Sequence, residues 1–198
     1  MVDGRQIYIL IYVDDILVAC EDEKHLPEVQ HELKKHFEIT ELGDLRSFLG
    51  MDIESKNGKY SISLKGYIEC LTEKYNLTNA KPVKIPIDPG YARDAGNSKL
   101  LKNDNDYRSL VGALLYISVN SRPDIAASMS ILGQRVSSPT EADWSAAKRV
   151  LKFLHTTSDL KLTFKNKTDK RLLGFADSDW AGDVATRKST SGYVFFVW

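Results

Sequence analysis

Two adjacent carboxylates near the start of the chain are the residues best suited to chemistry. Asp14 and Asp15 lie between two short apolar runs, residues 7–13 and 16–20, that are rich in β-branched and aromatic side chains. Such runs around a polar break predict a β-hairpin whose strands are buried on both faces. Two carboxylates at its tip would repel each other, and a divalent cation such as Mg²⁺ or Mn²⁺ would relieve the repulsion. The alternative is a solvated turn, which aspartate also favours.

Other reactive groups are sparse. The four histidines show no spacing with the two cysteines that fits a zinc site. The sequence contains no glycine-rich phosphate loop, and no serine or cysteine nucleophile has a partner that the spacing reveals. Trp144 and Trp180 are predicted to pack against protein rather than to stack on nucleobases.

The elements that must position the acidic pair follow from the periodicity of the apolar residues. A helical period predicts a helix over residues 26–37. Two strands, residues 48–53 and 60–64, are predicted to form a second hairpin, because the Asn-Gly dipeptide between them is the strongest short-range hairpin signal. A short helix is expected near residues 67–75.

The second half of the chain begins irregularly and then becomes periodic. Residues 78–103 are punctuated by proline and glycine and are predicted to be a linker or a long surface loop. Helices are predicted over residues 107–119 and 123–136. The strands expected near the end, with a turn at 166–170, are residues 160–164, 172–176 and 193–198.

A third helix of this half has the clearest start signal. Ser138 is predicted to be its N-cap, Pro139 occupies the first helical position, and Glu141 supplies the capping carboxylate. Its apolar stripe, predicted to face the core, consists of Ala147, Val150, Leu151 and Leu154.

Composition limits the class of protein. The chain has 198 residues, 27 basic and 27 acidic side chains and 42% hydrophobic residues, which is typical of one globular domain or two small ones. A net charge of zero gives no support to a nucleic-acid partner and, taken alone, argues against a polymerase. No apolar run reaches the ~20 residues that span a bilayer. Two cysteines and no secretory signal favour an intracellular, reducing compartment.

Several ordered segments resemble the reverse transcriptases of copia-type retrotransposons. The tetrad at residues 12–15, Tyr-Val-Asp-Asp between apolar runs, looks like the catalytic hairpin of these enzymes. The stretch at residues 176–193 resembles the opening of their ribonuclease H domain. The segments between them that are also similar to the family, in the same order, are residues 42–45, 48–51, 107–112 and 121–125.

The resemblance implies an α+β fold in three parts. Residues 1–65 would be the end of a reverse-transcriptase palm with its primer-grip hairpin. Residues 66–157 would form the helical thumb, and residues 158–198 the first strands of a truncated ribonuclease H-like sheet. The partners that this implies are an RNA or DNA template–primer and a deoxynucleoside triphosphate, and no membrane is expected as a partner. The implied location is a cytoplasmic retroelement particle with possible access to the nucleus.

The same resemblance assigns roles to individual residues. Asp14 and Asp15 would be two of the polymerase's three metal-binding carboxylates, with Mg²⁺ or Mn²⁺ as the cofactor. Tyr12 would lie beneath the primer terminus. The residues that would help to hold the primer strand are Phe48, Leu49 and Gly50.

Two further sites are implied. Asp177 would be the first metal-binding carboxylate of the ribonuclease H site, whereas without the resemblance it is an ordinary turn acid after a strand. Lys148, Arg149 and Lys152 on the third helix would contact backbone phosphates of the duplex. A solvated helix face is an equal alternative for these three basic residues.

The family's third polymerase carboxylate, its fingers subdomain and its later ribonuclease H acids have no counterpart in this sequence. We therefore expect the chain alone to perform neither reaction efficiently, since two-metal chemistry depends on all the ligands. A non-catalytic nucleic-acid-binding module and an inert retroelement relic remain alternatives. We also expect the hairpin over residues 7–20 to expose apolar faces and to make the isolated chain poorly soluble.

Overall fold

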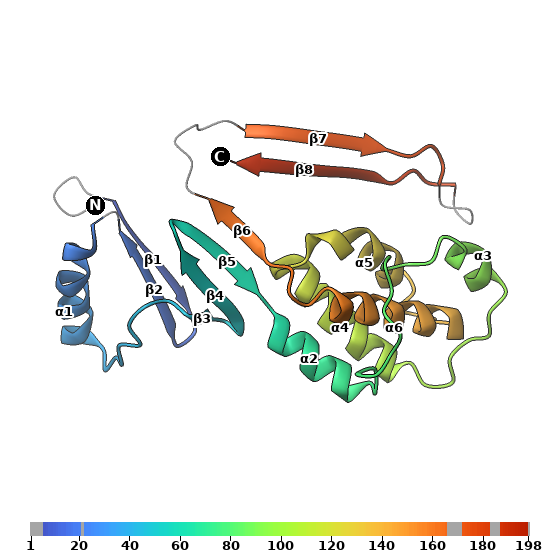
Figure 1. Ribbon diagram of the computed structural model, residues 1–198, viewed down its shortest axis with the longest axis horizontal. Coiled ribbons are helices and arrows are strands. Elements are labelled where there is room, and N and C mark those ends of the chain that lie inside the picture. Colours follow the sequence, from blue (N-terminus) through green and yellow to red (C-terminus); the bar gives the residue numbers. More distant parts are fainter. Residues whose placement is uncertain (1–5, 21, 166–171, 183–186, 198) are drawn as a thin grey trace. The chain divides into compact units, whose positions relative to one another are not determined.

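Figure 1 shows the computed structural model of the chain. It describes residues 6–20, 22–165, 172–182 and 187–197, without the side chains of residues 92–94 and 197. The chain divides into two units, residues 1–49 and 50–198, which are described separately below. Helices and small antiparallel sheets occur in the same chain, which confirms the predicted α+β class.

The first unit begins with the hairpin that carries the acidic pair. Strand β1 (Ile7–Tyr12) pairs antiparallel with β2 (Asp15–Cys20), and the last residue of β1 lies opposite the first residue of β2. The turn is therefore Val13-Asp14, and the predicted break at Asp14-Asp15 is wrong by one residue because Asp15 already pairs in the ladder. Val13 adopts a φ of 51°, in the positive range that two-residue hairpin turns need.

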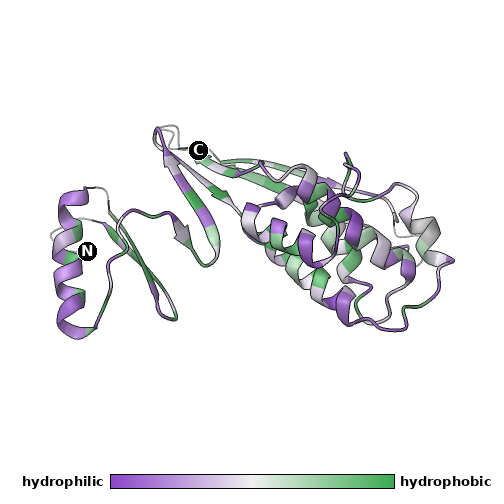
Figure 2. Cartoon of the chain, turned by 60° about the horizontal axis from the view of Figure 1, so that its bottom comes forward, coloured by the Kyte–Doolittle hydropathy of each residue, from purple (hydrophilic) through white to green (hydrophobic). Residues whose placement is uncertain are grey.

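This hairpin is open to solvent on both faces, so the prediction that its strands are buried on both faces is wrong for this chain. No residue of β1 or β2 is fully buried. Figure 2 shows apolar colour along both strands. The large apolar side chains that remain exposed are Tyr8, Ile9, Leu10, Ile11, Tyr12, Val13 and Ile16. Two strands alone have too few neighbours to cover both of their faces.

The rest of the first unit is a short turn, a helix and a strand. A 3₁₀ turn, η1 (Glu23–His25), leads into α1 (Leu26–His36), which carries Pro27 in its first turn as predicted. Helix α1 buries no side chain completely. Strand β3 (Ser47–Phe48) closes the unit.

The second unit opens with a three-stranded arrangement around the Asn-Gly turn. β4 (Met51–Lys56) and β5 (Lys59–Ser63) form the second predicted hairpin. Asn57 and Gly58 adopt φ values of 52° and 68°, as a type I′ turn requires. β6 (Leu162–Lys165) adds to the other edge of β5, a partner that the sequence pattern did not indicate.

Two ion pairs connect residues just before β6 with β4 and with the start of α2. Lys161 pairs with Glu54 across the sheet, and Lys65 Nζ lies 2.7 Å from Asp159 Oδ1. Each ammonium donates a hydrogen bond and adds positive charge, which lowers the pKa of Glu54 and of Asp159. These groups are solvated, so the pairs contribute more to register than to stability.

The core lies among the helices. They are α2 (Lys65–Lys74), α4 (Asn105–Asn120), the 3₁₀ turn η2 (Pro123–Ile125), α5 (Ala126–Gly133) and α6 (Glu141–Thr156). Helix α6 packs against α2, α4 and α5. The predicted stripe of α6 is fully buried, namely Ala147, Val150, Leu151 and Leu154. The other helices bury against it Ile68, Tyr107, Leu110, Leu114, Ile117, Ile125 and Leu132.

The start of α6 differs from the prediction. Its N-cap is Thr140, and Asp143 completes the capping box, so the assignment of Ser138 as N-cap is wrong. The reason is a bridge between two distant segments. Leu101 N–H donates to Pro139 O at 2.9 Å, Leu100 forms a β-bridge with Thr140, and Thr140 is extended, so the helix begins only after it.

Two other predicted helices agree in position but not in their ends. The helix predicted over residues 107–119 is α4, which begins earlier, at Asn105, and ends later, at Asn120. The helix predicted over residues 123–136 is split into η2 and α5 and ends at Gly133. The 3₁₀ turn η2 begins at Pro123, where a first-turn proline is tolerated because the N–H of that position has no partner in the helix.

The segment that joins α2 to α4, residues 78–101, lies along α6 and is called the strap below. It includes a short helix, α3 (Tyr91–Gly96), that its proline-rich pattern did not predict. The strap runs antiparallel to α6, since residues early in the strap bond to the end of α6 and residues late in the strap bond to its start. These bonds join Val83 N–H to Thr156 Oγ1, Asp88 to Arg149, Tyr91 to Asp143, and Ala142 N–H to Ser98 Oγ.

A buried carboxylate fastens the strap to the helix. Asp143 is 1% exposed and accepts hydrogen bonds from the Tyr91 hydroxyl, from Thr140 N–H at 2.7 Å and from Thr140 Oγ1 at 2.9 Å. These donors and the N-terminal end of the helix dipole offset the cost of burying the charge. Burial, followed by the hydrogen bond to Asp143, raises the pKa of the Tyr91 hydroxyl.

A buried arginine fixes the other end of α6. Arg122 is 3% exposed and donates to both carboxylate oxygens of Asp124, at 2.9 and 2.7 Å. It also donates to the carbonyl and hydroxyl oxygens of Thr157, at 3.0 and 2.7 Å. Its guanidinium therefore joins η2 to the C-terminus of α6.

The last two strands form a separate ladder. β7 (Leu172–Ser178) and β8 (Ser191–Val197) pair antiparallel, in agreement with the predicted strands, while the predicted turn at 166–170 lies outside the described residues. Gly174 lies under the ring of Phe195, and a Cβ at this position would approach the ring to 2.6 Å. None of the helices that the structure describes is long and apolar enough to cross a bilayer.

The Asp143 network generates a test of stability. Replacing Asp143 with Ala removes the helix cap and leaves the buried Tyr91 hydroxyl without its acceptor. We expect the free energy of unfolding to fall by about 2–4 kcal/mol, measured by urea denaturation. Asp159→Ala is the matched control, because it removes an acid that is exposed, and its urea midpoint should stay close to that of the parent. Equal midpoints for the two variants would contradict the role of Asp143.

The open hairpin generates a test of self-association. Ile9→Lys combined with Ile11→Lys places charge on the hairpin face that does not carry Tyr12 and Asp15. We expect the parent chain to associate and the double variant to be more monomeric in sedimentation velocity, because exposed apolar strands pair with other chains. Ile85→Lys, on the strap, should change nothing. A parent chain that is monomeric and melts sharply would refute this expectation.

Candidate metal and nucleic-acid sites

The acidic pair stands at the tip of the β1–β2 hairpin. Directly opposed residues of an antiparallel ladder project to the same face, so Tyr12 and Asp15 share one face of the hairpin. Asp14 occupies the second turn position next to them. Asp14 and Asp15 are both exposed, and Tyr12 is more than half exposed. The ladder therefore places Asp15 and Tyr12 on one face, with exposed Asp14 adjacent to them in the turn.

The two carboxylates fit part of a divalent-cation site. Their hard oxygens are the ligands that Mg²⁺ and Mn²⁺ prefer. Within the described ranges, no three histidine, cysteine, aspartate or glutamate side chains gather in a way that could hold a metal ion. The pair therefore needs further oxygen ligands, from nucleic acid, water or other protein residues, to complete a coordination shell.

The predicted primer-contact residues form a tight turn. The predicted strand over residues 48–53 is wrong at its start, because it is interrupted between Phe48, which ends β3, and Met51, which begins β4. Leu49 and Gly50 adopt φ values of 51° and 79°. Positive φ at two successive residues reverses the chain, so Phe48, Leu49 and Gly50 lie in and beside a turn rather than along a strand.

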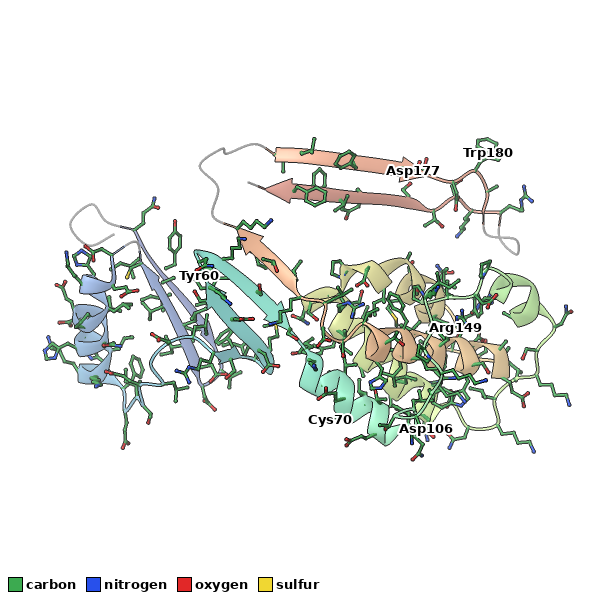
Figure 3. The ribbon with its side chains drawn as sticks, viewed as in Figure 1. Tyr60, Cys70, Asp106, Arg149, Asp177 and Trp180 are labelled. Atoms are coloured by element: carbon green, nitrogen blue, oxygen red, sulfur yellow. The ribbon has the colours of Figure 1, made fainter. Side chains whose placement is uncertain are left out.

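The three basic residues of α6 are half-buried rather than fully solvated. Lys148 Nζ lies 5.1 Å from the centre of the Trp144 ring. Arg149 NH1 lies 3.7 Å from Asp88 Oδ2 of the strap, and its Nε is buried without a hydrogen-bond partner. Figure 3 shows Arg149 within the helical region. Of the three residues, Arg149 thus has a structural contact that the sequence did not reveal.

The two tryptophans behave differently. Trp144 packs edge-on against Tyr75, with ring centres 5.7 Å apart, which confirms the prediction of packing. Trp180 is 92% exposed, so the same prediction is wrong for this residue. A two-stranded ladder offers no neighbouring element at its end against which an indole could pack.

Asp177 lies near the end of β7 and is exposed. Gly192 stands opposite it in the ladder, so no cross-strand side chain covers its carboxylate. Its Oδ1 accepts the N–H of Ser178 at 2.9 Å. Figure 3 shows Asp177 at the same end of the ladder as Trp180.

Asp179 is a residue whose role the sequence reasoning missed. Its backbone N–H donates to Thr190 O at 3.0 Å, and its Oδ1 accepts the N–H groups of Thr190 at 2.8 Å and of Gly182 at 3.3 Å. Asp179 thus joins the two sides of the loop after β7. An aspartate that is followed three residues later by glycine is a turn signal that could have indicated this role.

Comparison with known proteins agrees with the geometry of the hairpin. Residues 2–89 match the family model described as "Reverse transcriptase (RNA-dependent DNA polymerase)". No solved structure matches the chain.

Three relatives illustrate the similarity. The chain is 34% identical to the retrovirus-related Pol polyprotein from transposon TNT 1-94 of Nicotiana tabacum, over 98% of the chain and 15% of the polyprotein. It is 33% identical to the Pol polyprotein from transposon RE2 of Arabidopsis thaliana, over 98% of the chain and 13% of the polyprotein. It is also 33% identical to the uncharacterized mitochondrial protein AtMg00810 of Arabidopsis thaliana, over 96% of the chain and 78% of that protein.

The similarity extends over nearly the whole chain, but the chain spans only about a seventh of the Pol polyproteins it matches. The resemblance carried by the Tyr-Val-Asp-Asp tetrad and the ordered segments is therefore confirmed. The chain belongs to the reverse transcriptase family of copia-type retrotransposon Pol polyproteins, of which it covers a small part.

Proposed function

We propose that this chain is a segment of an RNA-directed DNA polymerase and contributes Asp14 and Asp15 to a metal centre for nucleotide addition at a primer 3′-hydroxyl. The observation that carries the proposal is the hairpin tip, where the ladder register sets Tyr12 on the face of Asp15 and leaves both acids exposed. Membership of the reverse transcriptase family supports it.

Each residue of the tip has a distinct task in this proposal. Asp14 and Asp15 would hold Mg²⁺ or Mn²⁺, which when bound activates the primer hydroxyl and stabilises the leaving pyrophosphate. Tyr12 offers an aromatic surface to the primer terminus on the Asp15 face. Asp14 lies in the turn and Asp15 is the first residue of β2, and both are exposed, so that nucleic acid could approach them without displacing protein.

The turn at Phe48, Leu49 and Gly50 would hold the primer strand. Gly50 adopts a φ of 79°, and its lack of a side chain would allow a close approach of a nucleic-acid backbone. Phe48 is half-buried and so presents only part of its ring to the strand.

The three parts of the chain would serve different steps. Residues 1–65 would belong to the polymerase palm, residues 66–157 to a thumb that grips the template–primer duplex, and residues 158–198 to the start of a ribonuclease H domain. In that domain Asp177 would be a metal-binding carboxylate. The helical core within residues 66–157 and the uncovered carboxylate of Asp177 support this division.

Contacts to phosphates would come from α6. Lys148 and Lys152 are half-buried along their stems, and long basic side chains in this position keep their ammonium groups in water. Arg149 would act with them, although its pairing with Asp88 also holds the strap. Such contacts fix the register of the duplex without reading its sequence.

A primer-extension assay tests the metal role. The 198-residue chain alone should extend a primer on a homopolymer template no better than its Asp14→Asn variant, because its acidic pair needs further ligands. In the tobacco polyprotein, with this chain replacing the matching segment, we expect extension with Mg²⁺, and Asp14→Asn should reduce it by more than about 100-fold, since even outer-shell partners of a metal are worth about 10–100-fold.

The matched control in that polyprotein is Asp106→Asn, which neutralises an exposed acid on α4. It should extend the primer like the parent. Equal activities of the Asp14→Asn variant and the parent would refute the metal role. Robust extension by the isolated chain that disappears in Asp14→Asn would instead refute its dependence on other ligands.

A binding assay tests the α6 contacts. Lys148→Glu combined with Lys152→Glu should weaken binding of the chain to a template–primer duplex. It should also reduce the slope of log K against log salt by about 0.9 for each phosphate contact that is lost. Fluorescence anisotropy at several salt concentrations measures both quantities.

Lys24→Glu is the control for this assay, because it reverses an exposed charge on η1. An effect of Lys24→Glu equal to that of the α6 variant would count against a specific phosphate surface. Duplex binding that depends on α6 in a chain without extension activity would favour a non-catalytic grip.

A further inference from the structure

The loop after β7 carries a tryptophan, Trp180, whose side chain is exposed to solvent. Trp180 is 92% exposed, although tryptophan is usually well buried in folded proteins. Figure 3 shows its side chain directed away from the ladder, at the end where Asp177 lies. Large exposed aromatic side chains of this kind are enriched where proteins bind partners.

Contacts within the loop hold the backbone on both sides of Trp180. Asp179 accepts hydrogen bonds from Thr190 and Gly182, and Ala181 N–H donates to Ser189 Oγ at 3.0 Å. Ala181 adopts a φ of 51°, which an alanine rarely does, so the loop keeps Trp180 outward at some cost in backbone strain.

Two cations lie on the chain segment that hydrogen-bonds to the residue after Trp180. Ser189 is bonded to Ala181, the residue after Trp180, and Arg187 and Lys188 directly precede Ser189. Both basic residues are exposed. The carboxylate of Asp179, which directly precedes Trp180 in the chain, accepts hydrogen bonds from backbone N–H groups.

We propose that Trp180 is a stacking surface for an unpaired nucleobase, and that Arg187 and Lys188 contact the phosphates of the same strand. An exposed aromatic ring beside basic side chains is the arrangement that binds single-stranded nucleic acid without sequence preference. The exposed lysine of this loop favours an anionic strand over a protein partner, because lysine is depleted at the core of protein interfaces. The proposal rests on the nucleic-acid function proposed above and adds a contact outside α6 and the β1–β2 hairpin.

Binding of single-stranded oligonucleotides of about 12 nucleotides, within the usual range of site sizes, tests this assignment. RNA and DNA versions are measured separately by fluorescence anisotropy. Trp180→Ala should weaken binding by about 5- to 150-fold, the usual value of one stacked base. Trp180→Phe should stay within about 3-fold of the parent, because phenylalanine also stacks.

Intrinsic fluorescence gives a second readout. The chain has three tryptophans, and stacking should quench Trp180, so that quenching by the oligonucleotide falls in Trp180→Phe. Tyr60→Ala, which removes an exposed aromatic side chain from β5, is the matched control and should bind like the parent. Arg187→Gln with Lys188→Gln should reduce the salt dependence of binding. RNA-only binding would identify the strand as RNA, and equal binding would identify either strand as a ligand.

Three results would overturn the proposal. They are a parent chain that binds neither strand, a Trp180→Ala variant that binds like the parent, and quenching that is unchanged in Trp180→Phe. The α6 double variant separates the two proposals. If it loses duplex binding while Trp180→Ala binds single strands normally, the stacking surface fails and the α6 grip stands, and the opposite pattern rejects the grip alone.

Discussion

The buried carboxylate of Asp143 is the interaction on which the best-packed part of the chain depends. It caps α6 and accepts the Tyr91 hydroxyl of the strap, so one side chain joins the start of the central helix to a long segment of irregular structure. Helix α6 in turn supplies the surface against which α2, α4 and α5 bury their apolar stripes. Arg122 performs the corresponding task at the other end of α6.

The candidate functional residues lie outside this core. The acidic pair is on a two-stranded hairpin, and Asp177 and Trp180 are on or after another. Such ladders expose apolar residues on both faces, and their main contacts are between their own two strands rather than with other elements. Local geometry, in the form of ladder register, turn conformation and loop hydrogen bonds, therefore positions these side chains in this chain. Completion of the metal ligand sets depends on groups that these ladders do not provide.

Several features were predictable because their causes are local. The Asn-Gly turn, the apolar stripe of α6 and the Tyr-Val-Asp-Asp tetrad each depend on a few neighbouring residues. The zero net charge wrongly argued against a polymerase. Charge summed over a small part of a polyprotein says little about the nucleic-acid-binding surface of the whole protein. The N-cap of α6 was misplaced because the bridge of Leu100 and Leu101 with Pro139 and Thr140, which no local pattern encodes, keeps Thr140 extended and delays the start of the helix.

The sequence by itself determined the family, the Asn-Gly turn and the residue types of the acidic pair, since these depend on motif order and local backbone preference. Only the tertiary structure decided that β6 pairs with β5, that Arg149 forms an ion pair with Asp88, and that the side chain of Trp180 is exposed to solvent. These features join or separate residues far apart in the chain. The first two depend on backbone pairing and charge pairing between distant segments, and the third on the absence of a packed neighbour for the indole among the described residues, none of which a single stretch of sequence contains.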